Sequence, residues 1–201
     1  MPRLVSACRR FTASTRGVAA IEFAMILPVL LILLLTAFDV GNAIAVYMKV
    51  RSATFTLAAI TNQYSINSPI QSADMTAITG ATSAILAPYS SSPVVVVVSQ
   101  VWIKAGGNAT ATVDWSATLN GTAHSIGSSV TLPAAIASST NTCNLYTPSG
   151  CYLILAQVSY TYTPLFGAFG TVINLSDTEW VTPRSSICIP YVPQTTTCDG
   201  T

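Results

Sequence analysis

Charged side chains are scarce in this chain. Asp, Glu, Lys and Arg make up 7% of its 201 residues, against about 25% in ordinary soluble domains. Half of the eight Lys and Arg residues precede residue 17, so few cations remain for the rest of the chain. A protein that binds nucleic acid needs a basic face for the phosphates. The composition therefore excludes a nucleic-acid partner.

Residues for catalysis and metal binding are also few. His124 is the only histidine, and it stands in a polar stretch without a Gly-x-Ser-x-Gly nucleophile turn. The sequence has no glycine-rich phosphate loop and no C-x2-C pair that would suggest zinc. Asp177 and Glu179 are close in sequence, but we expect them to solvate a strand end. We predict a protein that is not an enzyme and needs no metal or cofactor.

The positive charges gather at the amino end, before a long apolar run. Arg3, Arg9, Arg10 and Arg16 precede this run, and all seven Asp and Glu residues follow Arg16. No residue from Phe23 to Phe38 is charged, and a helix of that length spans about 24 Å, near the ~30 Å of a bilayer core. Short loops rich in arginine stay in the cytoplasm. We expect one membrane span with the remainder of the chain outside.

Glu22 stands only one turn inside the apolar run. A carboxylate at the bilayer centre costs about 2.5 to 3.5 kcal/mol on an insertion scale, and less near the edge. Two interpretations remain open from physics alone. Glu22 either has a partner for its charge, or it lies solvated at the headgroup level near the leader arginines.

Pro28 removes one helical hydrogen bond and frees the Ala24 carbonyl, which predicts a bend or a tolerated kink.

The cysteines indicate an oxidising compartment. Cys8 lies in the basic leader, and removing it leaves an even number. The remaining spacings, C-x7-C and C-x9-C, favour two local disulfides over crossed pairing. The predicted pairs are Cys143 with Cys151 and Cys188 with Cys198.

Apolar spacing predicts a long helix that continues beyond the span. Val46, Val50, Ala53, Leu57, Ile60 and Tyr64 recur every three or four residues and form one stripe. We expect this stripe to cover the domain's own core, with an intermolecular role as the alternative. The opposite side carries Lys49, Ser52, Thr56 and Asn62. A second helix is predicted from about Pro69 to Leu86, before Pro88.

The chemistry then changes to strands. PVVVVVSQVWI is rich in β-branched residues, and ATATVDWSATL alternates, which together predict a hairpin. In the second strand we expect one face to carry Ala111, Val113, Trp115, Ala117 and Leu119. A connection from about Asn120 to Gly150 leads to a strand with Ile154, Ala156, Val158, Tyr160 and Tyr162 on one face. A last strand is predicted around Glu179 to Ile189, which completes an α+β fold with a small antiparallel sheet.

A basic leader ends in Gly17, a glutamate stands fifth after it at Glu22, and the aromatic Phe23 follows. This order resembles the processing site of type IV prepilins of the tight-adherence class. The stretch RGVAAIEFAMILPVLLILLLTAFDVG is similar to the start of TadE-like pseudopilins, including the proline and the closing Asp39. VSYTYTPLFG and EWVTPRSS resemble their carboxy-terminal elements.

The resemblance implies a minor pilin or pseudopilin with a pilin-like fold. Residues 1–17 would be the leader, residues 18–40 the transmembrane helix, and residues 41–201 the extracytoplasmic, periplasmic domain. A prepilin peptidase would cut between Gly17 and Val18 at the cytoplasmic face of the inner membrane. The new Val18 amine would pair with Glu22 of a neighbouring subunit. Further expected partners are the major pilin, other pseudopilins and the inner-membrane pilus assembly platform.

Two interpretations from other classes remain. An ordinary secretory signal cut after Ala43 to Ala45 would release a disulfide-bonded binding protein. A plain membrane anchor could instead carry a ligand-binding outer domain with an exposed aromatic surface, made by Trp102, Trp115 and Trp180. We expect these three side chains in the core.

Overall fold

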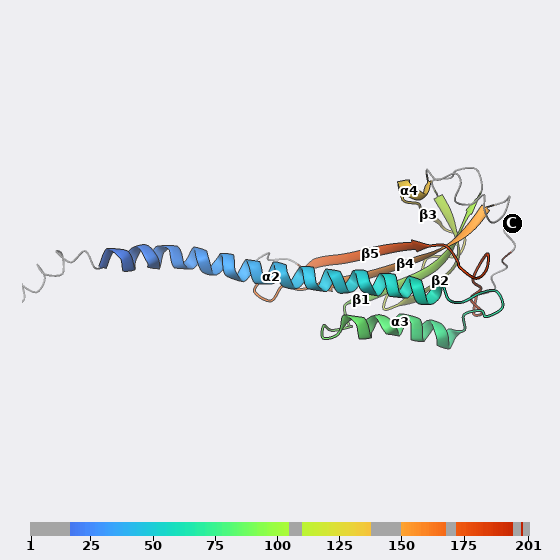
Figure 1. Ribbon diagram of the computed structural model, residues 1–201, viewed down its shortest axis with the longest axis horizontal. Helices are drawn as coiled ribbons and strands as arrows, with labels where there is room; N and C mark the ends of the chain where they lie inside the picture. Colours follow the sequence, from blue (N-terminus) through green and yellow to red (C-terminus); the bar gives the residue numbers. More distant parts are fainter. Residues whose placement is uncertain (1–16, 105–109, 138–149, 168–171, 195–197, 199–201) are drawn as a thin grey trace, which may run out of the picture. The chain divides into compact units, whose positions relative to one another are not determined.

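The computed structural model describes residues 17–104, 110–137, 150–167, 172–194 and 198 (Figure 1). The chain has an α+β architecture with a long amino-terminal helix, a second helix and a five-stranded antiparallel sheet. It forms two compact units. Unit 1 comprises Met1–Ala43 with Pro164–Thr171, and unit 2 comprises Ile44–Thr163 with Val172–Thr201.

The first helix, α2, spans Val18–Thr61 and contains Pro28 without ending there. Four residues of its predicted apolar stripe pack in the core of unit 2, namely Val46, Val50, Ala53 and Leu57. Ile60 is half-buried, and Tyr64 lies beyond the end of the helix. Two of the residues predicted on the opposite side, Lys49 and Asn62, make hydrogen bonds to other parts of unit 2. Lys49 Nζ donates to the carbonyl oxygens of Ile85 and Ala87, at 3.1 Å for Ile85. Unpaired carbonyls at a helix end attract a cation, which explains why this lysine turns inward.

The second helix, α3, spans Ser72–Leu86 and so begins three residues later than predicted. Its first turn is capped by Asp74, whose carboxylate accepts the backbone N–H of Gln71 at 3.0 Å. The preceding Ile70 is extended instead, because its N–H donates to the Pro190 carbonyl and its carbonyl accepts the Val192 N–H. Pairing with the carboxy-terminal segment therefore keeps residues 69 and 70 out of the helix.

The sheet has the order β3-β2-β1-β4-β5, and all its pairs are antiparallel. The predicted hairpin and the long strand after it are confirmed. The predicted position of the last strand is wrong. β5 ends at Val181, and Pro183 follows it without extending the sheet. The strands are β1 (Val94–Lys104), β2 (Thr110–Leu119), β3 (Ser129–Thr131), β4 (Gly150–Tyr162) and β5 (Ile173–Val181), with a short helix α4 (Ala134–Ala137) before β4.

A β-bulge divides β2 into two halves that face opposite sides of the sheet. Gln100 is paired with Trp115, whereas the next residue, Val101, is paired with Val113. Asp114 is therefore an extra residue, and an extra residue reverses the alternation of faces. The expectation that Ala111, Val113 and Trp115 share a face is wrong for this reason.

Because of the bulge, the sheet carries an apolar cluster that is separate from the fully buried Trp115. The cluster contains the amino-terminal half of β2 together with the neighbouring ends of β1 and β4, and Trp180 of β5 packs against it. Its buried members are Val101, Ile103, Ala111, Val113, Leu132, Cys151, Leu153 and Leu155. Both faces of β4 are consequently buried in this region, where its residues from Gly150 to Ala156 are all buried.

Candidate functional site

The amino-terminal half of α2 is an apolar surface that the described part of the chain leaves uncovered. All residues from Gly17 to Leu35 are exposed. The most apolar 18-residue stretch of α2 has a mean hydropathy of 2.8, and none of it is buried. Its length and composition are sufficient for crossing a membrane. We refer to residues 17–35 as the uncovered segment.

The residues predicted for processing and assembly lie together at the start of this segment. Gly17 precedes the helix and nothing lies within 4 Å of the position where its Cβ would be. Val18 is the first helical residue, and Glu22 follows one turn later with an exposed side chain. Phe23 is 59% exposed. The leader arginines that could neutralise Glu22 lie outside the described residues.

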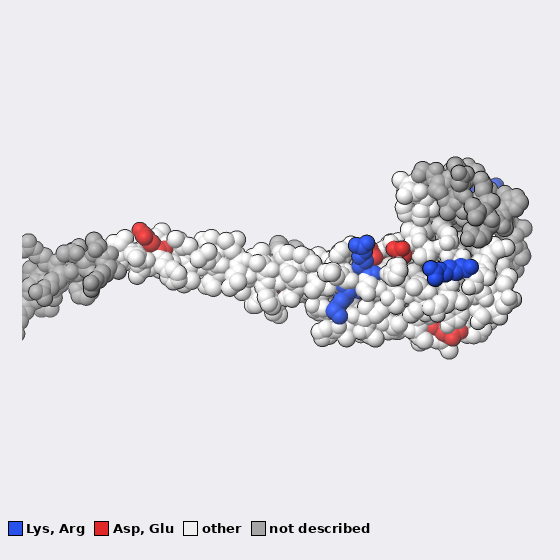
Figure 2. All heavy atoms as spheres, in the orientation of Figure 1, with Lys and Arg blue, Asp and Glu red and all other residues white. Residues whose placement is uncertain are grey.

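Figure 2 shows that charged side chains are sparse on the face of the described residues that it draws. The Lys, Arg, Asp and Glu side chains stand singly or in small groups between wide uncharged areas. The described residues contain no group of three or more His, Cys, Asp or Glu that could hold a metal ion. His124 is not simply solvated, because its Nε2 lies 2.8 Å from the side-chain oxygen of Gln157.

Asp39 has a structural role that the sequence did not reveal. Its side chain is only 1% exposed. Asp39 Oδ1 accepts the backbone N–H of Leu165 at 3.1 Å and that of Phe166 at 3.3 Å. Phe38 meets Phe166 edge to face, with ring centroids 5.6 Å apart. Unit 1 thus joins the end of the predicted span to the connection between β4 and β5.

One of the two predicted disulfides lies within the described residues. Cys188 is bonded to Cys198, with their Cα atoms 5.8 Å apart. Cys151 is also disulfide-bonded, whereas Cys143 lies outside the described residues. Of the three tryptophans, Trp115 is fully buried as expected, and Trp102 and Trp180 are half-buried. Trp102 packs on Tyr152 with ring centroids 4.6 Å apart.

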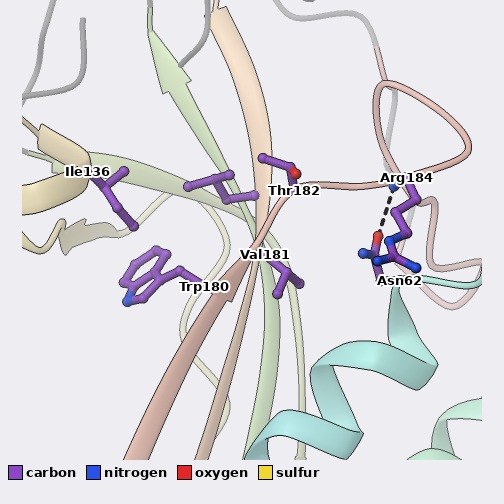
Figure 3. A pocket seen from close by; sticks show the side chains of 7 residues that line it. Asn62, Ile136, Trp180, Val181, Thr182 and Arg184 are labelled. Carbon is purple, nitrogen blue, oxygen red and sulfur yellow. Dashed lines mark hydrogen bonds between the residues drawn. The ribbon is translucent and has the colours of Figure 1, made fainter. Parts of the chain in front are cut away.

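A groove runs along the end of β5 in unit 2 (Figure 3). Ile136 and Trp180 line one part of it, and Asn62 and Arg184 line the other. Asn62 Oδ1 accepts the backbone N–H of Arg184 at 2.9 Å, which fixes the loop after β5 to the end of α2. Among the described residues that line the groove, no pair of side chains is suited to acid–base or nucleophilic catalysis.

Residues 17–58 match the model of the TadE-like protein family. In this segment the chain is similar to TadE-like proteins. The match begins at the glycine of the predicted processing site and ends within the part of α2 that packs in the core. No curated protein and no solved structure matches the chain.

Proposed function

We propose that the chain is a minor pilin or pseudopilin that is inserted in the inner membrane and cut between Gly17 and Val18 by a prepilin peptidase. It then takes part in assembly of a tight-adherence pilus. The observation that carries the proposal is the uncovered segment, which begins beside the proposed cut. Exposed apolar side chains are costly in water and suit either lipid or neighbouring helices. A subunit that moves from membrane to fibre needs one surface that accepts both environments.

Glu22 has a defined task in this proposal. Val18 and Glu22 are four residues apart on α2, so they lie on the same face of the helix. After cleavage the Val18 amine and the Glu22 carboxylate of a neighbouring subunit carry opposite charges, so they attract each other. If each Glu22 pairs with a neighbour's amine, adjacent helices are offset by about four residues, or about 6 Å. The charge pair would therefore select one register in the bundle.

The partners in this proposal are the prepilin peptidase, the major pilin, other pseudopilins and the inner-membrane assembly platform. The chain acts through binding, and we propose no catalytic activity for it. Its domain after residue 40 lies in the periplasm and can be carried into the extracellular pilus. That topology follows from the arginine-rich leader, because positive loops remain cytoplasmic.

The experiment that tests the proposal is amino-terminal sequencing of the mature protein from isolated membranes. Val18 as the first residue supports prepilin processing. A first residue at Ala43 or later would instead support an ordinary secretory signal. Met1 or Pro2 would support a plain membrane anchor and would contradict the proposal.

A further inference from the structure

We propose that the tip of the β4–β5 connection, Leu165 and Phe166, is a second membrane contact that inserts into the lipid interface beside the end of the span. The inference rests on the proposed membrane insertion of α2. It uses only contacts within unit 1, where α2 and this connection belong together.

The position of Asp39 along α2 places the tip at the depth of the headgroups. Asp39 lies 21 residues after Val18, which corresponds to about 32 Å of helix. A hydrocarbon core is about 30 Å thick, so a helix that enters near Val18 leaves the core near Asp39. The backbone N–H groups of Leu165 and Phe166 are bonded to this carboxylate. Both residues are therefore held at the outer interface.

The surface of the tip is chemically suited to lipid. Leu165 is 71% exposed, Phe166 is 48% exposed and the neighbouring Phe38 is 52% exposed. No residue from Thr163 to Gly167 is charged. Transfer of aromatic and aliphatic side chains from water into such positions lowers the free energy. The apolar surface of the tip also continues that of the span through Phe38.

Asp39 removes the main obstacle to insertion of a loop. Insertion of backbone N–H groups into a low-dielectric region without a hydrogen-bond partner is strongly unfavourable. At the tip these donors are satisfied by the Asp39 carboxylate, whose own charge is in turn stabilised by them. Asp39 is therefore a positioning residue for the membrane contact.

The test is tryptophan quenching in the full chain, reconstituted in vesicles of phosphatidylethanolamine and phosphatidylglycerol. Leu165→Trp reports on the tip, and Leu33→Trp, in an exposed position of the predicted span, reports on insertion of α2. Emission of the wild-type chain is subtracted to remove Trp102, Trp115 and Trp180. We expect lipids brominated near the headgroup to quench most of the emission added by Leu165→Trp. Lipids brominated deep in the chains should quench Leu33→Trp.

The outcomes separate this inference from the proposed function. If Leu33→Trp is quenched while Leu165→Trp stays accessible to aqueous acrylamide, the membrane contact is wrong and the span stands. Shielding of Leu165→Trp from both quenchers would mean that a protein neighbour covers the tip, which also overturns a lipid contact. Absence of quenching at Leu33→Trp would overturn membrane insertion and this inference with it.

A second variant tests the positioning role of Asp39. In the Leu165→Trp background, Asp39→Ala removes both acceptor oxygens, so quenching by the shallow brominated lipid should fall strongly. Asp39→Asn keeps one acceptor oxygen and should retain part of the quenching. Circular dichroism and the quenching of Leu33→Trp check that folding and insertion are unchanged. Equal quenching with aspartate and alanine at position 39 would contradict this role.

Discussion

The indole nitrogen of Trp115 donates a hydrogen bond to the backbone carbonyl of Ile189 at 2.7 Å, in the buried interior of unit 2. The backbone N–H of Ile189 donates to Gln100 Oε1, also at 2.7 Å. Both backbone groups of Ile189 are thus bonded by side chains of the central strands β1 and β2. Gln194 adds two further bonds to the backbone of Ser116. These hydrogen bonds therefore hold a carboxy-terminal segment that is not a strand against the sheet.

Trp115→Phe should lower the free energy of unfolding by about 1 to 3 kcal/mol, because it leaves the buried Ile189 carbonyl without its donor. Urea denaturation in detergent, followed by circular dichroism, measures the change. Trp102→Phe is the matched control, since Trp102 is half-buried and packs its ring on Tyr152. Equal losses in the two variants would show that the hydrogen bond to Ile189 contributes little.

Replacing Cys188 and Cys198 together by alanine should lower the free energy of unfolding by about 2 to 3 kcal/mol. The bond closes a loop with a sequence separation of 10, and closure reduces the entropy of the unfolded chain. Peptide mapping without reduction checks the pairing. Cys8→Ser, in the leader, is the control and should have no effect on the mature protein. Crossed pairing with Cys143 or Cys151 would contradict the local assignment.

Asp114→Asn should stabilise the domain at neutral pH. Burial raises the pKa of the Asp114 carboxyl, although the hydrogen bond from Gln100 Nε2 opposes the shift. The folded state therefore holds this proton more tightly than the unfolded chain, and stability falls as pH rises through the usual value of 3.8 toward the raised pKa. Asparagine keeps an acceptor for Gln100 and carries no charge. The gain should shrink as pH falls from the raised pKa toward 3.8 and should vanish below that value. A gain that is independent of pH would contradict this origin.

Gly17→Arg should block processing and leave the full-length protein in the membrane. A peptidase site that accepts glycine has no room for a long cationic side chain next to the cut. Mass spectrometry of the membrane fraction distinguishes the uncut chain from the mature one. Gly41→Ala, a substitution in open space within α2, is the control and should be processed normally. A mature mass unchanged by Gly17→Arg would contradict a cut at this position.

Glu22→Ala should abolish pilus assembly while leaving insertion, cleavage and folding nearly unchanged. Alanine suits the bilayer at least as well as glutamate, so the membrane step loses nothing. Each contact between subunits would however leave a Val18 amine without its carboxylate in a dry environment. Crosslinking to other pilins and a count of surface fibres, at matched membrane abundance, measure the effect. Normal association would mean that Glu22 is only an interfacial charge.

Local sequence patterns were sufficient for α2, β1 and the segment that can cross a membrane. The spacing of Val46, Val50, Ala53 and Leu57 predicted the buried stripe of α2, and it was correct because side chains three and four residues apart share one face of any helix. The β-branched run before Lys104 predicted β1 for a similarly local reason. The apolar run after Gly17 identified the segment that can cross a membrane, since hydropathy and length decide that capacity.

Relationships between distant residues required the tertiary structure. The alternating pattern of β2 gave no sign of the bulge at Asp114, because a bulge depends on the partner strand and on which core each half must fill. The sequence placed Lys49 on the side opposite the apolar stripe but did not reveal its partner. That partner is a carbonyl oxygen in the last turn of α3. Asp39 looked like the acidic end of a span. In the structure it accepts a hydrogen bond from the backbone N–H of Leu165, which lies 126 residues further along the chain. Periodicity reports which face of an element is apolar, whereas the partner of a buried polar group is fixed only when the chain has folded.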